Sequence, residues 1–472
     1  MEAKLKVNVN EKMNPNAKLS FKERLGYGIG DYSGNLIYSS ISAFLLLYYT
    51  NVVNADAAMA ASIIAISKIF DGISDLIMGR IVDKTKSKYG KARPWILRLC
   101  VPFAVSAVLM FSVPESLSGK YMFIYMFLTY NLVSTVFFTG INVPYAAMNG
   151  LMTTNQYERG LLGNFRMLLA TAGTMTVNTF VLKMVVALGN GDQYNRAGWT
   201  KAFVVIGIAT VVLNLFMFAT CKERVVEESS SNGDKKEEVS FIKSLKGLFT
   251  NKYWLLMVGV LFVMYFMMSC FFGSAAYYAQ YVIGDINKFA PISNALSMAQ
   301  IATMFCTPFI MKKIGKRNTM LIGTGVATIG FVFTGVAGAG VSLQVVASVI
   351  KGMGFGCSAA VMFGLLQDAI TYGQWKNGFG SSGMGNAASS FCMKVGSGIG
   401  TAALGWILAA GKFDATLAIQ SSSAMNAIGM SFIWIPAITM GIGVVCMCFY
   451  DLDKKYDKII ADLEAGRYMN SK

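Results

Sequence analysis

The sequence predicts an all-α membrane protein with twelve transmembrane helices in two halves of six helices each. The chain has 472 residues, of which 54% are hydrophobic and only 14% are charged. Apolar stretches long enough to cross a bilayer recur from Ala43 to Tyr450. Basic residues gather in alternate loops, as expected for a chain that crosses a membrane repeatedly. One long polar segment, residues 221–252, separates six expected spans from the next six.

Each expected span is an apolar run between polar or turn-forming segments. The spans cover residues 25–50, 57–82, 94–113, 121–149, 160–188, 200–220, 253–282, 290–312, 318–338, 342–372, 383–410 and 427–450. The chain then divides into an N-terminal segment (1–24), a six-helix bundle (25–220), a linker (221–252), a second six-helix bundle (253–450) and a tail (451–472). Two such bundles joined by a linker are typical of the major facilitator fold, whose binding site lies at mid-membrane between the halves.

Lysine and arginine residues indicate which loops face the cytoplasm. They are frequent in 1–24, 83–98, 221–252 and 311–317 and rare in loops such as 51–56. This asymmetry places both termini in the cytoplasm. The formal net charge of +16 is accounted for by these loops, so a nucleic-acid partner is not expected.

Several site chemistries are excluded by residue usage. The chain has no histidine, which removes the commonest metal ligand and the usual proton carrier near neutral pH. Its cysteines lie mostly inside apolar segments without metal-ligand spacing, so they are expected to be packing residues. The first 20 residues are polar and basic, so no cleavable signal peptide is expected. We expect no cofactor and no enzymatic activity.

Asp71 and Asp75 are the candidate cation-binding residues. They lie four residues apart in an apolar span, on one helix face and about 6 Å from each other. Carboxylates are rare inside membranes and mark ion or substrate paths. Because two such charges repel, one must be protonated or a metal cation must lie between them. Ser74 lies between the two acids, and Thr135 or Thr139 of a neighbouring helix can supply further oxygens, which suits sodium.

Two other interpretations of the acid pair remain open. Lys68 lies one turn before Asp71 and can neutralise it structurally, which leaves Asp75 unpaired. A membrane prenyltransferase also uses Asp-x-x-x-Asp, to hold Mg²⁺-diphosphate. Such an enzyme needs a second acidic motif, and the last six spans offer none.

Other polar residues inside the spans suggest a substrate site. Arg166 in the fifth span and Lys394 in the eleventh lie on corresponding helices if the two halves are repeats, so both are expected to point into one cavity. With the amides of Asn35 and Asn142 they suit a polyhydroxylated ligand. Alternatively, Arg166 only caps a cytoplasmic network. Lys351 is a further lysine inside a span.

A candidate gate lies at the cytoplasmic end of the tenth span. Asp368 closes that span, and the basic loop that contains Arg93 follows the second span. The acid and the loop either form a gate between the halves, or Asp368 simply ends a helix.

Five motifs carry a resemblance to a known family. They are Arg24-Leu-Gly-Tyr-Gly-Ile-Gly-Asp31, Tyr48-Tyr-Thr-Asn-Val-Val53, Phe70-Asp-Gly-Ile-Ser-Asp75, Gly90-Lys-Ala-Arg-Pro-Trp-Ile-Leu97 and Asn142-Val-Pro-Tyr145. Together they resemble the glycoside–pentoside–hexuronide:cation symporter family of the major facilitator superfamily, which includes the melibiose permeases. The resemblance covers nearly the whole chain.

The resemblance implies uptake of a sugar coupled to Na⁺ or H⁺. We expect the protein to lie in the cytoplasmic (inner) membrane of a bacterium and to be a monomer. It implies that Asp71 and Asp75 are cation-site carboxylates, with Ser74 replacing an asparagine that aids sodium use. It also implies that Arg166 and Lys394 are sugar-site and gating cations. A transport-inactive sugar sensor on the same fold remains an alternative.

Two substitutions relative to the melibiose permeases bear on the substrate. Asn35 and Asn142 stand where those permeases, which this chain resembles, carry sugar-binding aspartates. We therefore expect Arg166 and Lys394 to lack acid partners, unless Asp71 or Asp75 lies close enough to serve as one. An unpaired buried cation needs an anion or water, so an anionic sugar such as a uronate is one hypothesis and a neutral glycoside or pentoside is the other.

Overall fold

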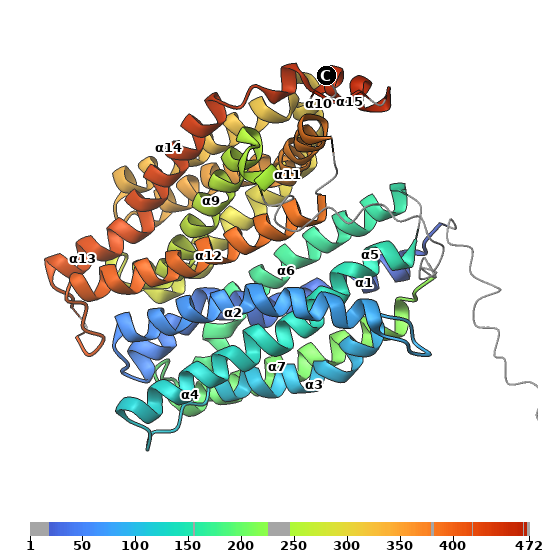
Figure 1. The fold of residues 1–472 in the computed structure, drawn as a ribbon. Helices are drawn as coiled ribbons and strands as arrows, with labels where there is room; N and C mark the ends of the chain where they lie inside the picture. The colour runs from blue at the N-terminus through green and yellow to red at the C-terminus, as the bar shows by residue number, and fades with distance from the viewer. Residues whose placement is uncertain are drawn as a thin grey trace, which may run out of the picture.

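The chain folds into two helical bundles that lie side by side (Figure 1). The computed structural model describes residues 18–153, 156–224, 246–378, 382–417, 419–465 and 467–469, and within these ranges every regular element is a helix. The predicted N-terminal segment lies outside the described residues up to residue 17, and the predicted linker does so from 225 to 245.

The first bundle is built from helices α1 to α7. Their bounds are α1 (Phe21–Ser40), α2 (Ala57–Lys84), α3 (Arg93–Met110), α4 (Gly119–Asn131), α5 (Thr139–Met152), α6 (Gln156–Leu188) and α7 (Arg196–Thr220). α1 continues into the π-helical segments η1 (Ile41–Leu45) and η2 (Tyr48–Val52), and η3 (Leu132–Phe138) joins α4 to α5. α4, η3 and α5 therefore form a single crossing.

The second bundle begins at α9. Its helices are α9 (Lys252–Tyr277), η4 (Tyr278–Val282), η5 (Ile286–Lys288), α10 (Phe289–Ala337), α11 (Val341–Asn377), α12 (Ser382–Ala410), α13 (Ser422–Gly429), η6 (Met430–Trp434), α14 (Ile435–Cys448), η7 (Leu452–Lys454) and α15 (Tyr456–Glu464). α10 bends at Gly315, whose φ of 81° is outside the helical region. Glycine adopts this backbone conformation without steric strain, and the bend divides α10 into two crossings.

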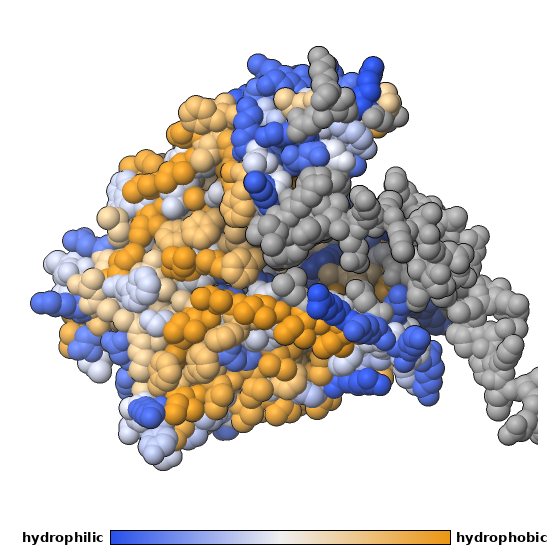
Figure 2. Space-filling model, viewed as in Figure 1, coloured by the Kyte–Doolittle hydropathy of each residue, from blue (hydrophilic) through white to orange (hydrophobic). Residues whose placement is uncertain are grey.

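The described helices account for the twelve predicted crossings. Ten segments are long and apolar enough to span a bilayer, and one of them is Ile286–Ala337, which contains both crossings of α10. The remaining crossing is α1 with η1 and η2, which is more polar and buries Ser33, Ser39 and Ser40. Figure 2 shows apolar side chains over the middle of both bundles and hydrophilic ones toward the ends, as a membrane protein requires.

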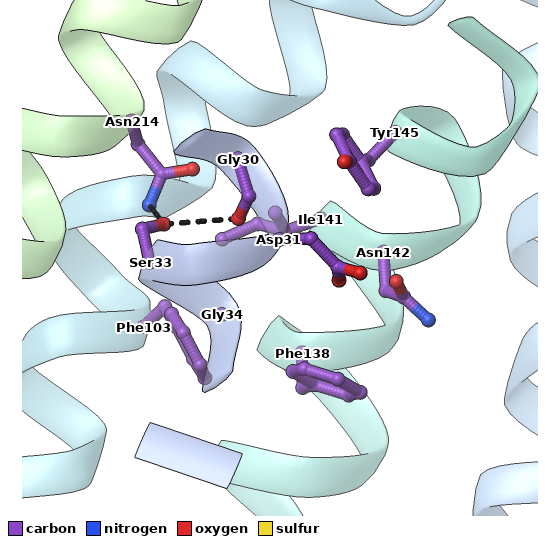
Figure 3. Close-up of a pocket in the computed structure, with 10 residues that line it drawn as sticks. All are labelled: Gly30, Asp31, Ser33, Gly34, Phe103, Phe138, Ile141, Asn142, Tyr145 and Asn214. Atoms are coloured by element: carbon purple, nitrogen blue, oxygen red, sulfur yellow. Dashed lines mark hydrogen bonds between the residues drawn. The ribbon is translucent and has the colours of Figure 1, made fainter. Parts of the chain in front are cut away.

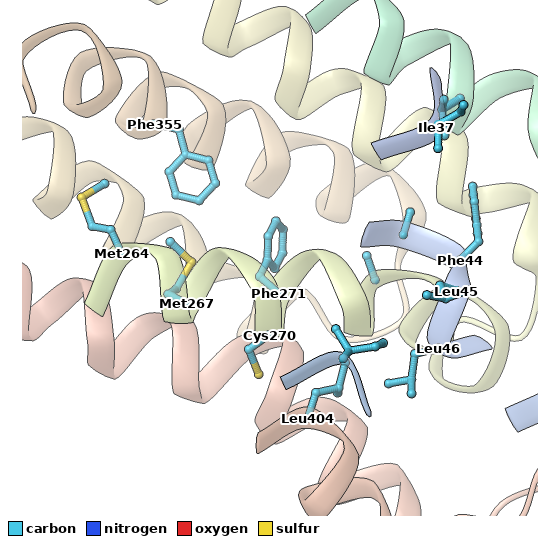
Figure 4. Packing of buried hydrophobic residues seen from close by; sticks show 14 of the residues in the cluster. Ile37, Phe44, Leu45, Leu46, Met264, Met267, Cys270, Phe271, Phe355 and Leu404 are labelled. Carbon is cyan, nitrogen blue, oxygen red and sulfur yellow. The ribbon is translucent and has the colours of Figure 1, made fainter. Parts of the chain in front are cut away.

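Glycines let α12 pack closely against α2 of the other bundle. A Cβ atom added at Gly405 would lie 2.1 Å from the Ala61 side chain, and one added at Gly398 would lie 3.1 Å from the Ala65 carbonyl oxygen. Small residues allow such close approach between membrane helices. Figure 4 shows the apolar core near this contact, where Leu404 of α12 lies close to Leu46, the residue after η1.

The two bundles meet at the end opposite the linker and diverge toward the linker (Figure 1). Hydrogen bonds that join the bundles at the closed end include Thr50–Tyr277 (2.7 Å), Asn51–Tyr281 (2.5 Å), Asn294–Thr179 (2.7 Å) and Gln280–Tyr194. At the linker end, the ion pairs Arg24–Glu158 (2.9 Å) and Lys316–Asp368 (2.7 Å) each lie within one bundle. The structure is therefore open at the end that carries the linker.

Candidate cation and substrate site

Helix α2 has one apolar face and one ionisable face. Ile66, Phe70, Ile73 and Ile77 are 45–56% exposed and follow one another at three- or four-residue spacing, so they form a stripe that contacts lipid. By the same helical spacing, Lys68, Asp71 and Asp75 lie on the opposite face. This arrangement turns the two carboxylates into the protein.

The Asp71 carboxylate is buried, and both of its oxygens accept hydrogen bonds. Its residue is only 4% exposed. Ser134 and Thr135 donate hydroxyl hydrogen bonds to its two oxygens, at 2.8 and 2.5 Å. The Lys68 ammonium lies 3.4 Å from Oδ2. The hypothesis that Lys68 neutralises Asp71 therefore agrees with the structure, but its corollary of an unpaired Asp75 does not.

Asp75 is bound by a lysine from the other bundle. Lys394 of α12 donates to Asp75 Oδ2 and also to the Asp71 backbone carbonyl, at 2.8 Å for the latter. Thr139 donates to Asp75 Oδ1 at 3.1 Å. The Ser74 hydroxyl donates to the Asp71 carbonyl (3.1 Å) and to Thr139 Oγ1 (3.2 Å) rather than to a carboxylate. Lys394 thus links the two bundles at the acid pair.

The π-helical segment η3 brings the hydroxyl groups to the acids. A π-helix repeats its hydrogen bonds over five residues, so Ser134 and Thr139 come to the same face. Both are buried, at 5% and 4% exposure, and both face α2. The expectation that Thr135 and Thr139 supply oxygens next to the acid pair is confirmed, and Ser134 adds another.

The cluster suits an alkali cation or a proton better than a transition metal. Its ligands are carboxylates, hydroxyls and a backbone carbonyl, all hard oxygen donors. Among the described residues, no three His, Cys, Asp or Glu side chains are grouped closely enough to hold a metal ion. Two ammonium groups already balance the two carboxylates, so an entering cation must compete with a lysine.

Arg166 has an acid partner, contrary to the expectation from the sequence. Its Nε donates to Asp31 Oδ2 at 3.0 Å, and its guanidinium lies 5.1 Å from the centre of the Tyr145 ring. Lys394 also has a partner, Asp75. The expectation that both cations are unpaired is therefore wrong: Lys394 pairs with Asp75, which the alternative allowed, and Arg166 pairs with Asp31, which the sequence did not suggest.

Asp31 is a charged residue of the site that the sequence analysis missed. It lies in the quoted motif Arg24–Asp31, six residues after the start of the first expected span. Asp31 was missed because an acid so close to the end of a span resembles a residue at the membrane surface. Its position inside the expected span could nevertheless have identified it, because acids inside a membrane by default mark functional sites.

Asn142 and Asp31 line a narrow crevice inside the first bundle (Figure 3). The other lining residues are Gly30, Ser33, Gly34, Phe103, Phe138, Ile141, Tyr145 and Asn214. Figure 3 shows the Asp31 carboxylate and the Asn142 amide on the same side of the crevice. The crevice therefore combines aromatic rings with amide and carboxylate groups, a combination suited to hydroxylated ligands.

Asn35 is held within the contact between α1 and α6. Its amide donates to the Asp31 carbonyl at 2.9 Å and accepts from Ser39 at 3.3 Å. Ser39 in turn bonds Thr174 of α6 at 2.9 Å. The substrate-binding roles of Asn35, Asn142, Arg166 and Lys394 stay predictions.

The two candidate gating residues each bind within their own bundle. Asp368 accepts from Lys316 at 2.7 and 2.9 Å. Arg93 donates to the Phe218 carbonyl at 2.6 Å and covers the Phe218 ring. A gate between them is not formed in this open arrangement, and their gating role stays a prediction.

Comparisons with known proteins place the chain in a family. The sequence profile of the MFS/sugar transport protein family matches residues 26–454. The isoprimeverose transporter of Lactiplantibacillus pentosus is 31% identical over 94% of this chain and 91% of its own length. The glucuronide carrier protein homolog of Escherichia coli (strain K12) is 28% identical over 95% of this chain and 96% of its own length.

A solved structure shares the fold. The xylose transporter XylE from E. coli, in its inward open conformation, superposes with a TM-score of 0.60 at 14% identity, covering 93% of this chain and 98% of that one. The chain belongs to the MFS/sugar transport protein family. It is a multi-pass membrane transporter of the major facilitator type and not an enzyme, so the prenyltransferase alternative is excluded.

Proposed function

We propose that the protein is a secondary active symporter that takes up a sugar together with Na⁺ or H⁺ by alternating access. The sugar is a glycoside, a pentoside or a hexuronide. The observation that carries this proposal is the contact of Lys394, from the second bundle, with the Asp75 carboxylate and the Asp71 carbonyl of the first. The ion cluster therefore contains residues of both bundles, which must move relative to each other during transport.

Coupling follows from competition for the same carboxylate. A proton on Asp75 removes the charge that holds the Lys394 ammonium, and a sodium ion takes over the carboxylate oxygens. Either cation weakens the bridge between α2 and α12. The cation thereby binds the two arrangements of the bundles with different affinity, which is the requirement for shifting between them.

Sugar as the substrate is supported by the other polar groups and by the relatives. The crevice and the Arg166–Asp31 pair offer amides, charged groups and aromatic rings to hydroxyls. One relative is named for isoprimeverose and another for glucuronides. No resident cofactor is needed, because a gradient of the coupling ion supplies the driving force.

We place the protein in the cytoplasmic (inner) membrane of a bacterium as a monomer, with both termini in the cytoplasm. The support is the gathering of basic residues in alternate loops. The open, linker-bearing end then faces inward. Cysteines introduced at Asn190 and at Ser231, which lies outside the described residues, test this orientation. An impermeant thiol reagent should label only Asn190→Cys in intact cells, and labelling of Ser231→Cys would contradict it.

Uptake of a panel of labelled glycosides, with and without a Na⁺ gradient and with a protonophore, tests the function. A symporter accumulates one of the sugars above its external concentration, and loss of one gradient abolishes that accumulation. Sugar binding to the purified protein without any uptake would instead show the transport-inactive sensor.

A further inference from the structure

Three ion pairs lie near the contact between the bundles among the described residues. The pairs are Arg166–Asp31 (3.0 Å), Lys394–Asp75 and Lys68–Asp71 (3.4 Å). Lys351, the remaining lysine at this depth in the second bundle, is 0% exposed and does not face this contact. A substrate carboxylate therefore finds no unpaired cation among these three pairs.

Arg166 remains accessible, but the Asp31 carboxylate already balances its charge. The side chain is 31% exposed and that of Asp31 is 17% exposed, so the pair borders the open space. Nε is bound to Asp31, and Tyr145 covers one face of the guanidinium. A guanidinium has further N–H donors, and these can bind the oxygen of a sugar hydroxyl.

A uronate is disfavoured at the same place by charge. Its carboxylate would have to share the Arg166 guanidinium with Asp31, which brings two like charges together in a poorly solvated site. A hydroxyl meets no such repulsion. The difference comes from Asp31 alone, because without its carboxylate Arg166 is a free bidentate anion site.

The crevice beside Asp31 also favours a group that donates hydrogen bonds. Asn214 is 2% exposed, and its Nδ2 donates to Ser33 Oγ (2.8 Å) and to the Thr210 carbonyl (2.9 Å), which fixes the amide orientation. Its Oδ1 has no hydrogen-bond partner. Asn214 and Asp31 thus both present acceptors in the crevice (Figure 3). The crevice has a free volume of about 10 Å³, room for about one water molecule. Such a water can donate to both acceptors and bridge them to a sugar hydroxyl, whereas an ionised carboxylate has only acceptors.

We infer that Asp31 is a charge-selectivity residue: it occupies Arg166 so that the site takes an uncharged glycoside or pentoside and rejects a hexuronide. This inference rests on the proposed sugar transport and narrows its substrate class. It also decides between the anionic and neutral hypotheses that the sequence left open.

Three nitrophenyl sugars test the inference on the purified full-length protein. The glucuronide differs from the xyloside by its carboxylate and from the glucoside by a carboxylate in place of a hydroxymethyl group. Calorimetric titration with both anomers of each gives dissociation constants. For the wild type, we expect the glucuronide to bind at least about tenfold more weakly than the better of the two neutral sugars.

Substitution of the acid tests its role directly. Asp31→Asn frees Arg166, so glucuronide affinity should rise about tenfold or more relative to the neutral sugars. Asp31→Glu keeps the charge and should keep the wild-type order. Glu158→Gln is the matched control, because Glu158 forms another ion pair between α6 and α1, with Arg24, and it should leave the affinity ratio unchanged.

The outcomes separate the two claims. Equal or tighter binding of the glucuronide by the wild type overturns the charge selectivity, even if Asp31→Asn fails to fold. An unchanged ratio in folded Asp31→Asn overturns the role of Asp31. If no nitrophenyl sugar and no sugar of the uptake panel binds the wild type, the proposed sugar transport itself is overturned and the selectivity falls with it.

Discussion

Two lysines of the second bundle, Lys394 and Lys351, have opposite surroundings. Lys394 has a 25% exposed side chain and reaches across to Asp75 and Asp71 of the first bundle. Lys351 on α11 is fully buried, and its Nζ has no hydrogen-bond partner. Three rings of its own bundle surround it at 5.0–5.3 Å, those of Phe271, Phe331 and Phe432.

The difference teaches where a buried charge can act in transport. A charge between the bundles can change partners when the bundles move, so it can couple cation binding at the cluster to that movement. A charge enclosed within one bundle keeps the same neighbours throughout, because the bundles move largely as rigid bodies. Cation–π contacts stabilise Lys351 without any acid. We therefore propose that Lys394 takes part in coupling and that Lys351 contributes only to packing.

The largest effect is expected when the Asp75 carboxylate, which binds Lys394, is removed. Asp75→Asn should abolish accumulation of the labelled sugar above its external level, because the coupling cation loses its carboxylate, while sugar binding persists. Uptake by energised cells measures accumulation, and titration of the purified variant with the sugar measures binding. Asp414→Asn, at an exposed residue of the loop between α12 and α13, is the control. Wild-type accumulation by Asp75→Asn would refute the cluster as the cation site.

The next largest effect is expected at Lys394 itself. Lys394→Met should lower coupled uptake about tenfold, since the bridge between the bundles is lost. It should also tighten binding of the coupling cation, because no ammonium then competes for Asp75. Cation-dependent thermal stabilisation of the purified variant measures this affinity. Weaker cation binding in Lys394→Met would argue against competition.

A smaller effect is expected from a single hydroxyl. Thr139→Val keeps the side-chain shape but removes the hydrogen bond to Asp75, so cation affinity should fall about three- to tenfold. The dependence of uptake rate on cation concentration gives this change. Thr171→Val serves as the control, because the Thr171 hydroxyl bonds only the Met167 carbonyl of its own helix. Equal effects of both substitutions would remove Thr139 from the cation site.

The smallest effect is expected at Lys351. Lys351→Met should leave the rate and concentration dependence of uptake within about twofold of the wild type. Thermal stability should be unchanged or higher, because an unpaired buried cation is costly and methionine packs well among aromatic rings. A loss of coupling as large as that of Lys394→Met would erase the distinction between the two lysines.

The sequence predicted the parts of the site that depend on local spacing. Asp71 and Asp75 share a helix face because they are four residues apart, and the apolar residues around them imply an intramembrane position. The twelve crossings follow similarly from apolar runs and basic loops. Thr135 and Thr139 were within reach because only a few neighbouring hydroxyls could face the acids.

The partners from distant segments were not predictable in this way. Asp31 and Arg166 are 135 residues apart, and Asp75 and Lys394 are 319 apart. No local periodicity encodes which of these groups meet. The π-helical turn of η3 also leaves no clear pattern, although it decides that Ser134 faces Asp71. The sequence therefore located the charged groups but not all of their pairing, and the Arg166–Asp31 pair is the observation that favours the neutral of the two substrate hypotheses.

Cation movement driven by sugar alone tests the central claim most directly. Proteoliposomes that contain the purified protein receive an inward gradient of the transported sugar, without any cation gradient, while internal Na⁺ and pH are recorded. The account predicts that sugar entry carries Na⁺ or H⁺ inward against its own gradient, and that Asp75→Asn vesicles show no such movement. Sugar entry with no change in either cation in wild-type vesicles would contradict symport.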